Sequence, residues 1–207
     1  MSLSWAAPAG DGVATALVEG TLLKLYSFDR FKSQSNDGDG GVESLEVAGE
    51  GVSADEVELG RVMAGAANAA RDLQNLPANV ATPSFLAERA TEIADEHEAL
   101  EVELFDREAI VALGMGAFAS VAQGSHQEPR LIVLRYRPSD ASGPHLGFVG
   151  KAVTFDTGGI SIKPSAKMQD MKFDMSGGAS PQPAKASTAK RAATRFICGA
   201  SAVACRS

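Results

Sequence analysis

Residues 150–178 restrict the possible folds more than any other segment, because glycine turns and charged side chains directly follow a predicted buried strand. Residues 146–155, LGFVGKAVTF, are an apolar run with embedded glycines, which is typical of a buried strand that another backbone approaches closely. Asp156 follows this strand, at the carboxyl end where open α/β sheets place their ligands. We therefore expect a site at this end of the sheet.

The chain after Asp156 is predicted to turn back on itself. The Thr-Gly-Gly sequence at 157–159 permits a sharp turn with positive φ. The following ISIK sequence returns the chain past the same region and ends at Lys163. Lys151, Asp156 and Lys163 are therefore expected to converge.

Two further acids follow in KMQDMKFDM, residues 167–175. Asp170 and Asp174 are four residues apart and share a face if the segment is helical, and the sequence leaves open which of them points inward. A different reading takes GFVGKAVT as a phosphate-binding Gly-Lys loop. In that reading the first glycine falls at His145 and Ala152 takes the Mg²⁺-binding Ser/Thr position, which disfavours nucleotide hydrolysis.

Residues 150–178, GKAVTFDTGGISIKPSAKMQDMKFDMSGG, resemble the metal-site segment of the leucyl aminopeptidases, the M17 family of two-metal exopeptidases. Residues 70–90 resemble the segment that opens the family's catalytic domain, and residues 115–136 resemble its approach to the metal strand. The resemblance covers roughly residues 12–179. It implies an α/β fold, a partial αβα sandwich of the M17 catalytic domain with a remnant of the N-terminal α/β domain.

The resemblance assigns roles to individual side chains. It makes Lys151, Asp156 and Asp174 ligands of two divalent ions, Mn²⁺ or Zn²⁺, and makes Lys163 the catalytic residue that polarises the substrate. Carboxylates suit such ions, and a lysine can bind one only as the neutral amine. The resemblance also places Met168 in a hydrophobic specificity pocket, whereas core packing is the alternative for Met168. Ala152 stands where the family usually has glycine, and its methyl group is expected to crowd the backbone beside Lys151.

The implied function is a metal-dependent aminopeptidase that releases N-terminal amino acids, preferentially leucine, from peptides. The family completes its site with an Asn-Thr-Asp-Ala-Glu-Gly-Arg motif, which does not follow residue 179, so three of five expected protein ligands are present. The alternative is therefore a catalytically inactive truncated fragment, or a subunit that assembles with intact copies. The resemblance also implies a homo-hexamer, although much of the domain that contributes to that assembly is not in this chain. The N-terminal MSLSWAAPAGDG has neither a basic region nor an apolar core, and no apolar stretch approaches the roughly 18 residues needed to span a bilayer, so we expect a cytoplasmic location without a membrane partner. A nucleic-acid partner is not expected, because the basic tail at 181–207 has no aromatic residue besides Phe196.

The last residues differ sharply in charge from the rest. Residues 1–180 hold 14 Lys and Arg against 26 Asp and Glu, a net of −12, while residues 181–207 hold five basic residues and no acid, giving −7 in total. We expect residues 1–50 to be the N-terminal remnant, 51–180 the first part of the catalytic domain, and 181–207 an unmatched basic tail. A frameshifted translation explains such a tail, and a basic segment for anionic partners is the alternative.

Local signals predict most of the other elements. Helical spacing marks residues 12–32, a capping box at Ser53 and Glu56 starts a long helix that joins the two domains, and Thr82-Pro83 starts another. Residues 100–105 and 131–136 are predicted strands, with a short helix capped by Asp106 between them. The alternating order favours a largely parallel sheet. The two cysteines and three histidines have no metal-site spacing.

Overall fold

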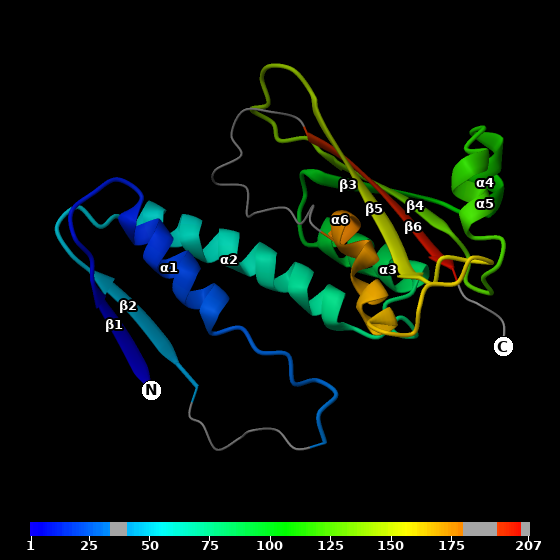
Figure 1. The fold of residues 1–207 in the computed structure, drawn as a ribbon. Coiled ribbons are helices and arrows are strands. Elements are labelled where there is room, and N and C mark those ends of the chain that lie inside the picture. The colour runs from blue at the N-terminus through cyan, green and yellow to red at the C-terminus, as the bar shows by residue number, and fades with distance from the viewer. Residues whose placement is uncertain (34–40, 180–193, 204–207) are drawn as a thin grey trace. The chain divides into compact units, whose positions relative to one another are not determined.

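The computed structural model describes residues 1–33, 41–179 and 194–203, and they form two compact units. The first unit holds the described residues up to Asp72, and the second holds those from Leu73 onward. The chain passes from the first unit to the second within helix α2 (Ala54–Asn75; Figure 1), later in the sequence than the boundary predicted at residue 50. Of the predicted tail, residues 181–193 and 204–207 lie outside the described residues, and residues 194–203 form a strand of the second unit.

The first unit pairs two parallel strands, β1 (Ser2–Ala6) and β2 (Ser44–Ala48), and packs helix α1 (Val13–Lys24) against α2. Ala14 and Val18 of α1 are buried. The helices approach closely at Gly60, where a Cβ atom would lie 2.5 Å from the carbonyl oxygen of Thr15. The helix predicted within residues 12–32 is therefore present and ends at residue 24.

The start of α2 confirms half of the predicted capping box. The hydroxyl of Ser53 accepts a hydrogen bond from the backbone N–H of Glu56 at 3.2 Å. The Glu56 carboxylate does not complete a reciprocal pair, because its Oε1 accepts from the backbone N–H of Gly12 at 2.8 Å. Glu56 thus connects the helix start to the turn before α1.

The second unit contains a four-stranded sheet in the order β3-β4-β6-β5. These strands are β3 (Leu100–Phe105), β4 (Arg130–Tyr136), β5 (Leu146–Asp156) and β6 (Thr194–Val203). The β3–β4 and β4–β6 pairs are antiparallel, and only β5–β6 is parallel among the described strands. The prediction of a largely parallel sheet was therefore wrong, although the α/β class is correct.

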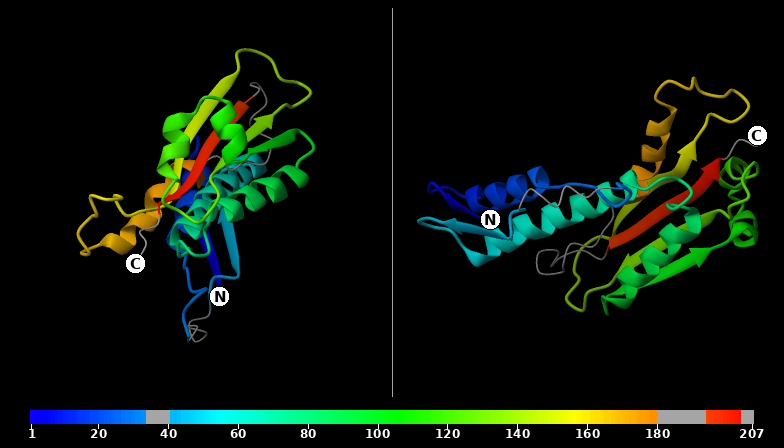
Figure 2. Two further views of the ribbon diagram at one scale, coloured as in Figure 1. Left: turned by 90° about the vertical axis from the view of Figure 1, so that its right-hand side faces the viewer. Right: turned by 90° about the horizontal axis from the view of Figure 1, so that it is seen from below.

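The lengths of two helices explain this difference. Helices α4 (Arg107–Ala112) and α5 (Gly116–Val121) separate β3 from β4 and have six residues each. A six-residue helix is about 9 Å long, whereas a six-residue strand is about 20 Å long. Neither helix can return the chain along the sheet, as a parallel crossover requires. Instead α4 and α5 lie at one end of the sheet (Figures 1 and 2).

The core of this unit lies between the sheet and its helices. Helix α3 (Pro83–Asp95) packs on β3 and β4 and buries Leu86, Ala87 and Ala90. Its predicted cap is confirmed, because Thr82 Oγ1 accepts from the backbone N–H of Phe85 at 3.2 Å. A second cluster joins α4 and α5 to β4, and its buried members are Ile110, Ala119, Leu131 and Val133. The predicted Asp106 cap of α4 is also present.

The 3₁₀ helix η1 (Met168–Met175) and the short helix α6 (Ser176–Ala179) pack against β5. The backbones meet at two glycines, since a Cβ atom on Gly150 would lie 2.0 Å from the carbonyl oxygen of Gly177. This contact requires glycine at residue 150 and confirms the close approach predicted for the strand. Within the described ranges, no helix has the length and apolar character needed to cross a membrane.

Candidate active site

The loop after β5 is the first part of the site, and its turn has the predicted form. Gly158 and Gly159 have φ values of 86° and 71°. The Asp156 carboxylate accepts from the backbone N–H of Gly158 at 2.9 Å, and the Thr157 hydroxyl accepts from that of Gly159 at 3.3 Å. The backbone N–H of Lys163 donates to the carbonyl oxygen of Thr157 at 2.9 Å, which returns Lys163 to the end of β5.

Asp156 is held in its charged form by this loop. The hydrogen bond from the Gly158 N–H lowers the pKa of the Asp156 carboxyl below its ordinary value, and the ammonium of Lys163 lowers it further. Lys151 adds a weaker electrostatic contribution to the same lowering of the pKa. Asp156 is therefore an anionic oxygen donor at neutral pH.

Lys163 makes three polar contacts through its ammonium group. Its Nζ atom lies 3.1 Å from Oδ2 of Asp156 and 3.1 Å from the main-chain carbonyl oxygen of the same residue. It also lies 3.0 Å from Sδ of Met171 in η1. The side chain of Lys163 is 37% exposed, so its ammonium is held by the protein and is still accessible from solvent.

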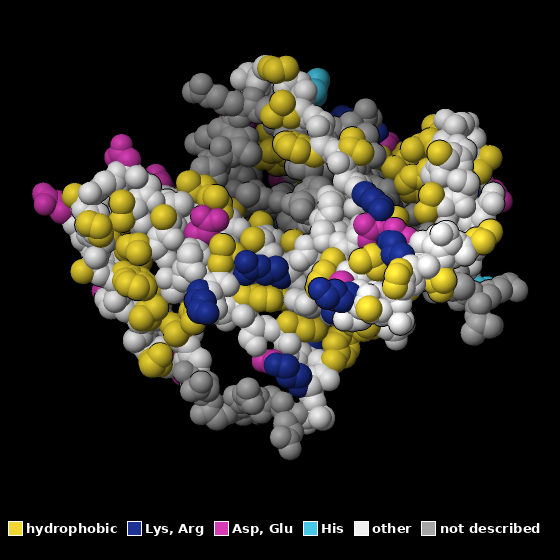
Figure 3. All heavy atoms as spheres, viewed as in Figure 1, with side chains coloured by type: hydrophobic (Ala, Val, Ile, Leu, Met, Phe, Trp, Pro, Cys, Tyr) yellow, Lys and Arg dark blue, Asp and Glu magenta, His cyan; other side chains and the backbone are white. Residues whose placement is uncertain are grey.

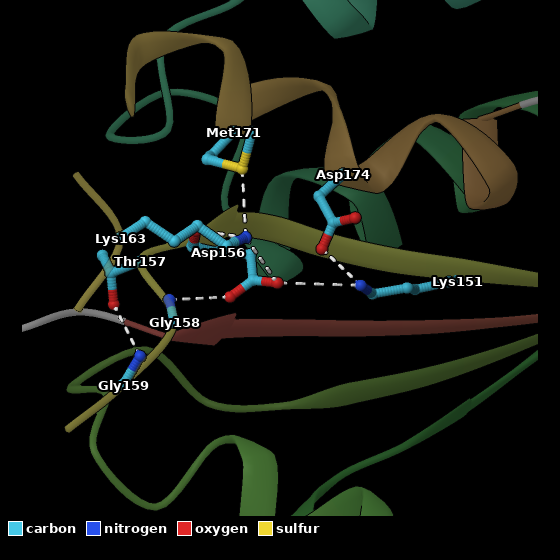
Figure 4. A network of polar contacts seen from close by, with 8 residues as sticks. All are labelled: Lys151, Asp156, Thr157, Gly158, Gly159, Lys163, Met171 and Asp174. Atoms are coloured by element: carbon cyan, nitrogen blue, oxygen red, sulfur yellow. Dashed lines mark hydrogen bonds and ion pairs between the residues drawn. The ribbon is translucent and has the colours of Figure 1, made fainter. Parts of the chain in front are cut away.

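Lys151 stands between the two carboxylates. Its Nζ atom lies 2.5 Å from Oδ2 of Asp174 and 3.8 Å from Oδ2 of Asp156 (Figure 4). Asp156 ends β5 and Asp174 comes from η1, so the network joins the strand, the loop and the 3₁₀ helix. The structure thus brings together all four residues predicted as metal ligands or catalytic: Lys151, Asp156, Lys163 and Asp174. Basic and acidic side chains also adjoin at the surface in the space-filling view (Figure 3).

The pitch of η1 decides which acid faces β5. In a 3₁₀ helix residues three apart eclipse each other, so Met168, Met171 and Asp174 share one face. Asp174 reaches Lys151 and Met171 reaches Lys163 from that face. The expectation that Asp170 and Asp174 share a face applies to an α-helix and does not hold for this helix.

Met171 was not singled out from the sequence as a contact of Lys163. The signal available was the three-residue spacing of Met168, Met171 and Asp174, which becomes a common face only when the helix type is known. The neighbouring Lys172 points elsewhere, because its Nζ donates to the main-chain oxygen of Asn75 at 3.4 Å. Lys172 thereby connects η1 to the end of α2.

The methyl group of Ala152 lies away from Lys151. Ala152 is 0% exposed, whereas the side chain of Lys151 is 59% exposed, so these successive side chains point to opposite sides of the strand. Ala152 fills part of the core. Lys151 keeps free access to the acids on its own side.

The donor set fits a divalent metal ion. Lys151, as an ammonium, neutralises the carboxylates of Asp156 and Asp174, which is the electrostatic role that a bound cation would take over. Two carboxylate oxygens and one amine nitrogen are suitable ligands for Mn²⁺ or Zn²⁺. The described part of the chain contains no group of three His, Cys, Asp or Glu side chains placed to hold a metal. Lys151 is the nitrogen donor that lies beside the two acids.

Comparison with known proteins adds independent evidence. The profile described as "Cytosol aminopeptidase family, catalytic domain" matches residues 68–204. The match extends beyond residue 179, where the resemblance read from the sequence ended. A probable cytosol aminopeptidase of Solibacter usitatus is 48% identical over 173 residues, which cover 83% of this chain and 35% of that protein. The cytosol aminopeptidase of Pseudomonas aeruginosa is 45% identical over 177 residues, covering 81% and 34%.

Two solved structures are similar to this chain in fold. The bottromycin maturation enzyme BotP in complex with Mn superposes with a TM-score of 0.78 at 31% identity, covering 92% of this chain and 40% of that one. The cytosol aminopeptidase of Coxiella burnetii gives a TM-score of 0.77 at 24% identity, covering 95% and 41%, and shares the fold. The chain therefore spans about a third of the length of the curated relatives that it matches.

Proposed function

Because this chain belongs to the cytosol aminopeptidase family, peptidase family M17, we propose that it carries part of the active site of a metal-dependent aminopeptidase. The proposed reaction is hydrolysis of the first peptide bond of a peptide, with release of its N-terminal amino acid. The family consists of hydrolases.

The convergence of Lys151, Asp156, Asp174 and Lys163 is the observation that carries this proposal. Taken singly, an exposed lysine or aspartate is usually a solvated surface charge. Here two lysines and two acids from three segments meet within contact distances of 2.5–3.8 Å at the end of one strand. Such a cluster supports a site that uses closely spaced positive and negative groups.

We assign the metal ligands as Lys151, Asp156 and Asp174. When bound, divalent ions lower the pKa of a coordinated water and polarise the scissile carbonyl. The chain's own contribution is to supply two anionic oxygens and one amine on a rigid strand and helix. Asp156 is suited to this role because the Gly158 N–H keeps its pKa low and its carboxylate charged.

Lys163 is proposed to donate a hydrogen bond to the oxygen of the scissile carbonyl. That oxygen becomes negatively charged in the transition state, and a fixed ammonium stabilises the developing charge. The two contacts with Asp156 hold the ammonium at the edge of the metal-ligand cluster. Lys163 can thus act on a substrate that binds next to Asp156.

The finer properties are proposed from the family relationship. We propose Mn²⁺ or Zn²⁺ as the metal, in accord with the Mn complex of BotP. We also propose leucine as a preferred first residue, Met168 as part of its pocket, and the cytoplasm as the location. Met168 lies on the same face of η1 as Met171 and Asp174, which supports a place beside the substrate.

A second candidate is a catalytically inactive fragment, free or assembled with longer copies in a hexamer. One observation favours it: the described residues provide three protein ligands, whereas two ions need more. The two candidates differ in turnover. Both predict some metal binding, and only the first predicts metal-dependent hydrolysis by this chain.

Hydrolysis of leucine p-nitroanilide by the purified 207-residue chain with Mn²⁺ tests the proposal. Lys163→Ala should abolish turnover, while Lys24→Ala, which removes an exposed lysine of α1, should leave it unchanged. Turnover that survives Lys163→Ala would contradict the assigned role of Lys163. A wild-type chain that binds Mn²⁺ without turnover would support the inactive fragment.

A further inference from the structure

Met171 occupies an unusual position for an apolar residue, because its sulfur contacts a charged group. The Nζ atom of Lys163 lies 3.0 Å from Sδ of Met171. An ammonium group has three N–H donors. The carbonyl oxygen of Asp156, its Oδ2 atom and the Met171 sulfur are three acceptors at 3.1, 3.1 and 3.0 Å, so each N–H has one partner.

These three acceptors differ in strength. A carboxylate forms a charge-assisted hydrogen bond, and a carbonyl is a good neutral acceptor. A thioether sulfur is a weak acceptor. The contact with Met171 is therefore the least costly one for Lys163 to give up. Both stronger contacts go to Asp156 and hold the ammonium beside the proposed metal ligands.

We propose that Met171 is a positioning residue, which holds the third N–H of Lys163 in place and releases it to the carbonyl oxygen of a peptide substrate. This inference rests on the proposed function, because it requires Lys163 to act on that oxygen. Met171 reaches Lys163 from the face of η1 that also carries Asp174 (Figure 4). One helix thus positions a metal ligand and the partner of the catalytic ammonium.

The thioether is better suited to this role than water or a strong acceptor. Lys163 is 37% exposed, so without the sulfur its third N–H would bind water. A substrate oxygen would then have to displace a water that is the better hydrogen-bond acceptor, which weakens the gain from the new bond. Leucine in place of Met171 fills a similar volume and offers no acceptor, and it therefore isolates the effect of the sulfur.

The kinetic test compares Met171→Leu with Met63→Leu, the same change at a 43% exposed methionine in α2. We expect Met171→Leu to raise KM for leucine p-nitroanilide by about 3- to 10-fold, with kcat within about twofold, because the substrate oxygen must first displace the water that replaces the sulfur on Lys163. Met63→Leu should change neither constant. An unchanged KM, or a rise in KM that accompanies a loss of thermal stability, would overturn the proposal.

A second measurement tests the contact without relying on turnover. In protein labelled with ¹³C at the methionine methyl groups, and with diamagnetic Zn²⁺ in place of Mn²⁺, Met171→Leu identifies the Met171 signal. That signal should move in Lys163→Leu and stay close to its wild-type position in Lys163→Arg, which retains N–H donors. A Met171 methyl signal at the same position in the wild type, Lys163→Leu and Lys163→Arg would overturn the proposal. Absence of wild-type turnover, with the methyl shift present, would instead contradict the proposed function.

Discussion

The ammonium nitrogen of Lys151 lies 2.5 Å from Oδ2 of Asp174, although the two residues belong to a strand and to a 3₁₀ helix. The side chain of Asp174 is 27% exposed, so its charge is partly withdrawn from water and needs a positive partner. The pair fixes η1 against β5. It also places Asp174 of η1 near Asp156, the acid that ends β5.

Metal affinity should depend on Asp156 and Asp174 and not on Asp170. Asp156→Asn or Asp174→Asn replaces an anionic ligand by a weaker neutral one, and we expect each to raise the dissociation constant of Mn²⁺ at least about tenfold, equivalent to about 1.4 kcal/mol. Isothermal titration calorimetry of the whole chain measures this effect. Asp170→Asn is the matched control in the same helix. Equal losses in all three variants would contradict the assignment.

The contact between Gly150 and Gly177 should tolerate no side chain. Gly150→Ala puts a methyl group 2.0 Å from a carbonyl oxygen, so α6 must move away from β5, at a cost of about 1–3 kcal/mol. Hydrogen exchange of β5 peptides measures this change. Tryptophan fluorescence is not suited to it, because the single tryptophan, Trp5, lies in the other unit.

A glycine with free surroundings provides the control for that change. Gly65 lies within α2, and no atom would lie within 4 Å of an added Cβ. Gly65→Ala should therefore stabilise its helix by about 0.5–1 kcal/mol. Destabilisation by Gly65→Ala, or unchanged exchange of β5 in Gly150→Ala, would contradict the packing described for these two positions.

Replacing Lys167 by glycine should stabilise the start of η1. It has φ 62° and ψ 17°, the left-handed conformation, at the start of η1. A residue with a Cβ atom adopts that conformation at a cost of about 1–2 kcal/mol, which glycine avoids. Glycine loses more conformational entropy on folding, so the net gain in stability is smaller than this cost. We expect Lys167→Gly to slow hydrogen exchange in η1. Lys167→Ala keeps a Cβ atom and should not slow hydrogen exchange in η1. Equal effects of the two changes would indicate that loss of the lysine charge is responsible.

Stability should depend on pH through Asp156. The pKa of its carboxyl is lowered in the folded protein, chiefly by the Gly158 N–H, so its contribution is complete above the unfolded value of about 3.9. The contribution is lost as pH falls through the lower folded value. In the presence of a chelator, Asp156→Asn should be less stable than the wild type near pH 6, and the difference should shrink below about pH 4.

Hydrogen exchange of β5 peptides between pH 3 and 6, corrected for the intrinsic pH dependence of exchange, measures this difference. Glu50→Gln, at an exposed acid of the first unit, controls for the loss of one negative charge. A difference between Asp156→Asn and wild type that stays constant down to pH 3 would show that the carboxylate charge is not what stabilises the loop.

Features that depend on neighbouring residues were predictable from the sequence. Asp156 follows an apolar run, and two glycines after it permit the turn that returns Lys163, so the convergence on Asp156 needed only local rules. The caps at Thr82 and Asp106 were recognisable for the same reason. These signals each lie within about eight residues of the feature that they determine.

Features that depend on distant contacts were not predictable. The strand β6 fills the place between β4 and β5, and its pairing partners lie far away in sequence. The antiparallel direction of β3 and β4 follows from the shortness of α4 and α5. The residue pattern alone left open the choice between Asp170 and Asp174, and only the family resemblance pointed to Asp174. That choice depends on a 3₁₀ pitch in η1, and no residue of that segment demands this pitch by itself.

The three-residue repeat of η1 makes the number of residues between Met168 and Asp174 as important as their identity. Deleting one residue there would turn Asp174 by about 120° away from Lys151 while leaving all the chemical groups in the chain. An alignment that permits a gap in this segment would then score a relative as intact although its acid faces solvent. Ungapped spacing across residues 168–174 is therefore a stricter criterion for recognising this site in other sequences than the presence of its lysines and aspartates.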